Sequence, residues 1–128
     1  MKYLAQAKNP SRDGWEVFIG RWQPWHKGHR WLIDQQINRG GKALIMIRDM
    51  EPNDSNPFTA EEVRANLGKH LSGPIEAGKV MIMVIPDIAS INIGRGVGYD
   101  IIEHTPPDEV AEISGTATRA KMREDGTL

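Results

Sequence analysis

Residues 15–29 read WEVFIGRWQPWHKGH, and this stretch decides how the fold begins. Its first five residues are a largely apolar run that predicts a strand, and apolar residues from Trp31 to Ile37 recur at helical spacing. Between these two segments, Gly20 and Pro24 turn the chain. A helix that begins after such a turn offers free backbone N–H groups and the positive end of its dipole, and both bind phosphate.

The turn also carries side chains that donate hydrogen bonds to anionic oxygens, namely Arg21, His26, Lys27 and His29. Gly28 lies between the histidines and lets a ligand approach the backbone. Because the histidines share one helical face, they also fit two other interpretations, ligands of a metal ion or a solvated structural pair. No cysteine or obvious third ligand accompanies them, and their place at a helix start favours a phosphate site.

Strands and helices alternate along the rest of the chain. Thr59 and Glu62 have the capping-box pattern that begins a helix, which we expect to run to about Leu71 and to stop at residues 72–74. The other expected elements are strands near 15–20, 42–48, 79–85 and 98–104, and helices near 28–39 and from about residue 115. The nearly unbroken apolar strands predict an α/β, Rossmann-like fold, a parallel sheet with helices on both faces. We expect one domain over 15–128, after an irregular lead-in at 1–14.

In such a sheet, ligands bind beyond the carboxyl ends of the strands. Arg48 and Asp87 each follow an apolar run and are expected at this edge, together with residues 114–116 at the start of the last helix. Arg119 lies about one turn into that helix and can reach the same anion. Ser114 or Thr116 fits the simpler role of a helix N-cap as well. Two basic helix starts at one sheet edge nevertheless predict a bound polyphosphate.

The composition excludes several classes of function. The 128 residues contain 16 basic and 17 acidic side chains, so no overall field attracts nucleic acid or an anionic membrane. There is no cysteine for a disulfide or thiolate site, and no run of the sequence resembles a signal peptide or a membrane span. We therefore expect a cytoplasmic protein without nucleic-acid or membrane partners.

Two further features of the sequence are less specific. Residues 94–98 read GRGVG, but a strand-like run follows instead of a helix, so we expect a loop that carries Arg95 and no dinucleotide fingerprint. Trp22, Trp25 and Trp31 cluster near the expected phosphate site. Packing in the core and stacking on a base or substrate ring both remain open for these tryptophans.

HKGH at 26–29 and ISGTATR at 113–119 resemble the two defining motifs, HxGH and ISxTxxR, of the cytidylyltransferase-like nucleotidyltransferase superfamily. Within that superfamily, residues 20–26, 56–62 and 114–116 resemble archaeal-type nicotinamide-nucleotide adenylyltransferases. Small phage and bacterial nucleotidyltransferases are similar too, through the segments IPDI and GRGVGY at 85–88 and 94–99.

The resemblance spans roughly residues 15–125. In this chain the segment between Asp87 and Gly98 is much shorter than in the archaeal-type enzymes, which build part of their nicotinamide pocket there.

The resemblance implies that a phosphorylated small molecule attacks the α-phosphorus of a nucleoside triphosphate, with ATP favoured, and that pyrophosphate leaves. The acceptor that it suggests is nicotinamide mononucleotide. Mg²⁺ would be held mainly by the nucleotide phosphates, without dedicated protein ligands. A phosphate nucleophile is already ionised at neutral pH, so positioning and charge stabilisation suffice for catalysis.

The resemblance assigns residues to three roles. Catalysis falls to His26, His29 and Arg119. Nucleotide binding falls to Gly20, Arg21, Lys27, Gly28, Ser114, Gly115 and Thr116. Substrate binding falls to Trp22, Arg48, Asp87 and Arg95.

Other functions compete with this one. Cytidylyl transfer to a phosphorylated alcohol uses the same motifs, because they contact the triphosphate and not the base. A nucleotide-binding sensor without turnover and a Zn²⁺-dependent hydrolase are alternatives from other classes. A homo-oligomer is an alternative to the monomer, since relatives often assemble and exposed tryptophans favour burial.

Overall fold

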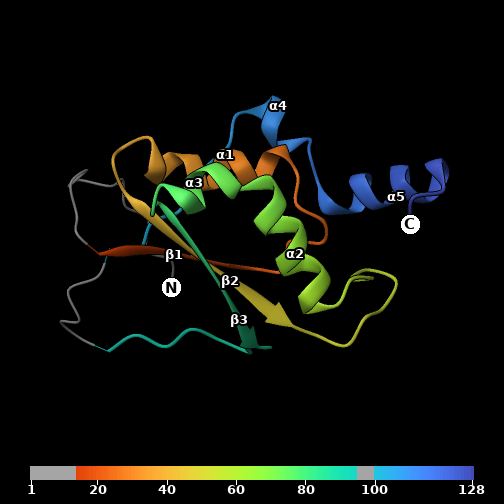
Figure 1. Cartoon of the computed structure of the whole chain (residues 1–128), viewed down its shortest axis with the longest axis horizontal. Helices are drawn as coiled ribbons and strands as arrows, with labels where there is room; N and C mark the ends of the chain where they lie inside the picture. Colours follow the sequence, from red (N-terminus) through yellow and green to blue (C-terminus); the bar gives the residue numbers. More distant parts are fainter. Residues whose placement is uncertain (1–13, 95–99) are drawn as a thin grey trace.

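The computed structural model describes residues 14–94 and 100–128 (Figure 1). The order of the elements is β1 (Trp15–Gly20), α1 (Lys27–Ile37), β2 (Lys42–Asp49), α2 (Ala60–His70), α3 (Ser72–Glu76), β3 (Val80–Pro86), α4 (Asp108–Ala111) and α5 (Gly115–Asp125). Within these residues the three strands form one parallel sheet in the order β1-β2-β3. The predicted α/β, Rossmann-like fold of a single small domain is confirmed.

The hydrophobic core lies on one face of this sheet. Alternate residues of β2 are fully buried there, Ala43, Ile45 and Ile47. The core is completed by Ile33 of α1 and Leu67 of α2, which are fully buried in the same cluster. Crossovers between parallel strands are right-handed as a rule, so two that advance in the same direction, β1 to β2 and β2 to β3, put both helices on the same side.

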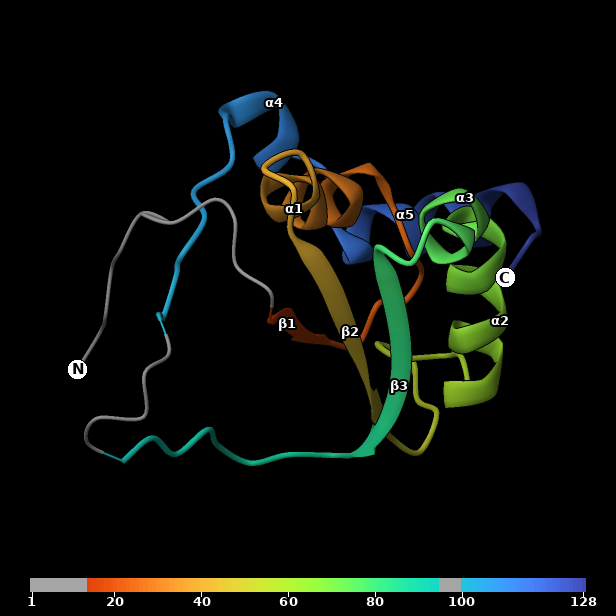
Figure 2. The ribbon, with the colours of Figure 1, turned by 60° about the vertical axis from the view of Figure 1, so that its left-hand side comes forward.

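The opposite face of the sheet differs from the prediction, which placed helices on both faces. In the described part of the chain, α1, α2 and α3 lie together on one side (Figure 2). The other face leaves Val17 52%, Met81 45% and Met83 42% exposed, and the strand register brings Val17, Leu44 and Met81 side by side. The apolar strand runs predicted that helices would bury both faces of the sheet. The described helices bury one face.

The helix boundaries follow local chemistry. Thr59 and Glu62 form the predicted capping box of α2, with Glu62 N–H donating to Thr59 Oγ1 and Thr59 N–H donating to Glu62 Oε1. α2 ends at His70, as predicted, but residues 72–74 then form the first turn of a further helix, α3. Pro74 is tolerated there because first-turn N–H groups lack intrahelical partners anyway. Gly78, with φ +73°, then leads the chain into β3.

The segment after β3 contradicts one further prediction. Residues 98 and 99 of the strand expected at 98–104 lie outside the described residues, and residues 100–104 form no strand. A strand persists only where its backbone groups find a partner edge, and this segment pairs with none of the three strands. The lead-in expected at 1–14 falls outside the described residues apart from Gly14. No helix among the described residues is long and apolar enough to cross a membrane.

The one-sided core predicts a contrast between two aliphatic positions on neighbouring strands. Ile45→Ala should lower the free energy of unfolding by about 2–5 kcal/mol, because it leaves a cavity beneath α1 and α2. Met81→Ala on the open face should cost less than about 1 kcal/mol. Urea unfolding of both variants measures the difference, and equal losses would show that the open face is covered in solution.

Candidate functional site

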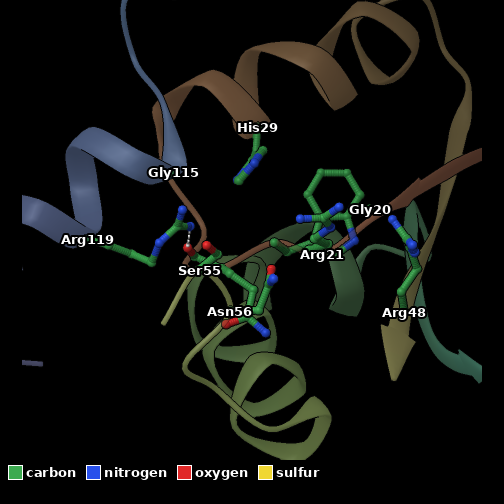
Figure 3. Close-up of a pocket in the computed structure, with 10 residues that line it drawn as sticks. Gly20, Arg21, His29, Arg48, Ser55, Asn56, Gly115 and Arg119 are labelled. Carbon is green, nitrogen blue, oxygen red and sulfur yellow. Dashed lines mark hydrogen bonds between the residues drawn. The ribbon is translucent and has the colours of Figure 1, made fainter. Parts of the chain in front are cut away.

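A pocket of about 350 Å³ lies at the carboxyl ends of β1 and β2 (Figure 3). Its lining residues are Gly20, Arg21, Trp22, Gln23, His29, Arg48, Ser55, Asn56, Gly115 and Arg119. Three of these are arginines and none is acidic, so the lining favours an anion. The pocket occupies the sheet edge that the sequence predicted.

The two histidines of the HKGH segment cap α1. His26 is the N-cap, and its Nδ1 accepts from the N–H groups of Gly28 (3.1 Å) and His29 (3.3 Å). In return, His29 Nδ1 accepts from the N–H of His26 at 3.2 Å. The imidazole rings stack with centroids 3.6 Å apart. This is a capping box made of two imidazoles, in which each ring satisfies N–H groups that would otherwise lack partners.

The capping box fixes which nitrogen carries the proton. A ring nitrogen that accepts from a backbone N–H must be unprotonated, so in the neutral ring the proton sits on Nε2. His29 lines the pocket, and its Nε2–H is the donor left for a ligand. Burial, together with the neighbouring His26, lowers the pKa of His29 to about 3. His29 is therefore a neutral hydrogen-bond donor at pH 7, and the positive charge of the site comes from arginines.

The start of α5 meets the start of α1. Ser114 is the N-cap of α5, where its Oγ accepts from Ala117 N–H at 3.0 Å. Arg119 reaches back to the β1–α1 turn, with Nη1 donating to the Gln23 carbonyl at 2.6 Å and Nη2 to Thr116 Oγ1 at 3.3 Å. The predicted convergence of two basic helix starts is thus present in the structure.

Glycines permit this close approach. A Cβ on Gly115 would come within 2.8 Å of Arg119 Nη1. A Cβ on Gly28 would come within 2.9 Å of the His26 ring and 3.6 Å of the Ile113 carbonyl. Burial, followed by the charges of Arg123 and Arg21, lowers the pKa of Arg119 from its ordinary value.

Arg48 and Asp87 form an ion pair at the ends of β2 and β3. Arg48 donates to Asp87 Oδ1 from Nε and Nη2, both at 2.7 Å, and Nη2 also lies 3.4 Å from the Ile88 carbonyl. Arg48 lines the pocket, whereas Asp87 does not. Asp87 therefore holds the Arg48 side chain in position and does not itself line the pocket.

The remaining predicted site residues that the structure describes do not line the pocket. Lys27 is the exposed first residue of α1. In addition to Asp87, the predicted site residues that do not line the pocket are His26, Lys27, Gly28, Ser114 and Thr116. Arg95 lies outside the described residues.

Three lining residues escaped the sequence prediction, namely Gln23, Ser55 and Asn56. Gln23 is 5% exposed, and its side-chain amide binds both backbone groups of Phe58, donating to the carbonyl at 2.8 Å and accepting from N–H at 2.9 Å. Asn53 Oδ1 accepts from the N–H groups of Ser55 and Asn56, at 2.9 and 2.8 Å. The segment at 56–62 contributed to the family resemblance, and this was the available signal for Asn56.

No family model matches the chain. Among curated proteins it is similar to nicotinamide-nucleotide adenylyltransferases of several archaea. It is 28% identical to that of Caldivirga maquilingensis over 113 residues, which is 86% of this chain and 62% of the relative. For Ignicoccus hospitalis the identity is 32% over 75 residues, 56% of this chain and 44% of the relative. For Methanocorpusculum labreanum it is 26% over 132 aligned positions, covering 83% and 77%. The resemblance seen in the sequence is confirmed, and the chain spans 62% and 44% of the first two relatives.

The lowered pKa of His29 predicts a loss of stability in mild acid. The unfolded histidine titrates near pH 6.5 and the folded one near 3, so the unfolded state binds more protons between these values. The stability due to neutral His29 is complete above pH 6.5 and is lost as the pH falls. Between pH 7.5 and 5.5 the loss from His29 should be about 1.4 kcal/mol.

Urea unfolding at the two pH values measures this loss. The pKa values of His26 and His104 are also lowered, chiefly by burial, and add losses of the same sign. His29→Asn keeps an acceptor near the position of Nδ1 but does not titrate, so its pH dependence should be weaker. A variant with the wild-type pH dependence would contradict the assignment.

The hydrogen bonds of Gln23 predict a structural cost for its removal. Gln23→Ala leaves the N–H and carbonyl of Phe58 without partners, and we expect a loss of about 2 kcal/mol or more in the free energy of unfolding. Gln35→Ala is the matched control, because among the described residues the side chain of Gln35 bonds to the Trp31 carbonyl of its own helix, α1. Comparable losses in the two variants would show that the contact with Phe58 stabilises the fold no more than the hydrogen bond of Gln35 within α1.

Proposed function

We propose that this chain is a nucleotidyltransferase that moves AMP from ATP to nicotinamide mononucleotide or a similar phosphorylated small molecule, releasing pyrophosphate. One observation carries the proposal. The helix starts that bear His29 and Arg119 meet at a pocket with three arginines and no carboxylate. The similarity to archaeal nicotinamide-nucleotide adenylyltransferases supports the same chemistry and suggests the acceptor.

The described lining of the pocket has donors for a triphosphate and no carboxylate to act as a general base, which suits a phosphate nucleophile. An acceptor phosphate is ionised at neutral pH and can attack the α-phosphorus directly, so the protein has only to align the reactants and stabilise charge. His29 would donate its Nε2–H to an α-phosphate oxygen, where charge builds up in the transition state. A neutral donor that is already oriented needs no proton transfer during the reaction.

The leaving pyrophosphate would be held by the start of α5. The free N–H groups of the first turn of α5 and the Arg119 guanidinium meet at the pocket. Arg119 is pre-oriented, because its Nη1 is bonded to the Gln23 carbonyl. Arg21 adds positive charge from the β1–α1 turn. Lys27 and His26 would contribute further hydrogen-bond donors at the rim of the pocket.

The other substrate would approach from the β2 side of the pocket. Arg48 lies there with its guanidinium fixed by Asp87, so one edge of the guanidinium is committed and the rest is available to the acceptor phosphate.

The donor set of the pocket suits Mg²⁺ that enters with the nucleotide. The described residues contain no cluster of three histidine, aspartate or glutamate side chains suited to a metal ion, while Ser55 and Asn56 offer neutral oxygens at the pocket. The nucleotide phosphates would hold most of the ion, which when bound would neutralise charge on their oxygens.

Pyrophosphate release tests the proposal. With Mg²⁺, ATP and CTP should each be offered with nicotinamide mononucleotide and with phosphorylated alcohols, pantetheine and sugars. Turnover with ATP and nicotinamide mononucleotide is the expected result. Turnover with CTP and a phosphorylated alcohol would identify the cytidylyl alternative. Nucleotide binding without turnover of any pair would favour a sensor.

Two variants test the assigned roles. His29→Asn keeps an acceptor for the capping box and loses the Nε2–H donor, and Arg119→Ala removes the guanidinium. Each should lower kcat about 100- to 1,000-fold, the usual effect of losing one charge-stabilising donor. Arg64→Ala, at an exposed position of α2, is the matched control and should turn over like the wild type. Near-normal kcat in His29→Asn would remove His29 from the mechanism.

A further inference from the structure

Trp22 occupies an unusual position at the start of the β1–α1 turn. Its side chain is 4% exposed, and its backbone has φ 53°, a left-handed conformation that bulky residues rarely adopt. Gly20 makes room for the folded-back indole, because a Cβ on Gly20 would lie 2.9–3.2 Å from three ring atoms of Trp22. Neighbouring structure therefore holds a strained residue in place, a pattern that points to a functional constraint.

The indole of Trp22 links the sheet to the catalytic imidazole. Its Nε1–H donates to the Met46 carbonyl on β2 at 3.0 Å. The indole meets the His29 ring edge-on, with centroids 4.9 Å apart and planes at 83°. Trp25 contacts the same imidazole at 5.4 Å and the indole of Trp22 at 5.7 Å. His29 is thus enclosed by two indoles and by the His26 ring stacked on it.

We propose that Trp22 is a positioning residue, which fixes the His29 ring so that Nε2–H faces the pocket as a neutral donor. The role of Trp22 is then distinct from stacking on a base, since its ring already contacts Trp25 and His29 and is anchored to Met46. The effect of Trp22 on turnover rests on the proposed function, whereas its effect on the His29 ring does not.

Charged groups around His29 act in the same direction as this packing. His26 faces the ring from the N-cap of α1. Arg21 from the turn, Arg48 from β2 and Arg119 from α5 share the pocket with His29. Burial, together with the neighbouring His26, disfavours a second proton on the imidazole, and the arginines place positive charge in the same pocket. The indole contacts also restrict the orientation of the ring, together with the capping hydrogen bond to Nδ1 and the stacked His26 ring. A change at Trp22 should therefore loosen that hydrogen bond and alter the tautomer in addition to the titration.

The test is NMR of the imidazole nitrogens in protein without substrate. In the wild type, His29 should show unprotonated Nδ1 and protonated Nε2, with no titration from pH 8 to 5. Trp22→Phe removes the anchor to Met46, and Gly20→Ala displaces the indole while leaving Trp22 present. Both variants should mix the two tautomers and bring the titration of His29 towards pH 6.5. Trp31→Phe, the same kind of change on α1 without a ring contact to His29, should match the wild type.

Kinetics provide the second readout. Trp22→Phe should lower kcat by about tenfold, as expected for a misplaced catalytic donor, and change the KM for ATP by less than about twofold. His29→Asn lacks the Nε2–H donor altogether, so its kcat is the lowest value that misplacement of His29 can produce.

Several results would overturn the proposal. These are a wild-type His29 that titrates near pH 6.5 or carries its proton on Nδ1, variants with unchanged His29 signals, or a fall in kcat without a change at His29. If Trp22→Phe does not fold, Gly20→Ala and the wild-type spectrum still decide. Absence of wild-type turnover would count against the proposed function. The NMR experiment does not depend on turnover and would still test the role of Trp22.

Discussion

The site depends on how the first turn of α1 satisfies its backbone N–H groups. Most helices use a hydroxyl or carboxylate for this task, and here two imidazoles do it. Because each Nδ1 is committed to the backbone, Nε2 is the nitrogen left to donate. The same hydrogen bonds that begin the helix thereby determine the protonation pattern of the candidate catalytic residue. Helix capping and the proposed recognition of phosphate are two consequences of one local arrangement.

Gln23 extends this arrangement to segments that are remote in the sequence. Its side chain holds the backbone of Phe58, and its carbonyl accepts from Arg119, 96 positions further along the chain. Arg123 adds a direct contact between α5 and the loop before α2, through the carbonyl of Asp54. One buried glutamine therefore links the β1–α1 turn, the loop that carries Ser55 and Asn56, and α5. These contacts hold the three segments that line the pocket in fixed positions relative to one another. The proposed alignment of two substrates would require this.

The sheet itself is simpler than its apolar strands suggested. Three parallel strands with both crossovers on one side leave Val17, Met81 and Met83 exposed on the other face. The pocket does not depend on that face, because it is built from strand ends, helix starts and the loop before α2. A partly covered sheet can thus support a pocket lined by three arginines.

The sequence by itself determined the local features. Apolar runs, the Thr59–Glu62 capping box and the turn at residues 20–26 located β1, β2, β3 and three of the helices. The sequence also predicted His29, Arg21 and Arg119 as anion donors, and all three line the pocket. Tertiary structure decided what depends on contacts between distant segments. Asp87 binds Arg48, Gln23 binds Phe58, and residues 100–104 pair with no strand. The physical reason is that capping and periodicity involve neighbours within one or two turns, whereas a hydrogen-bond partner across the pocket exists only once the crossovers have been packed.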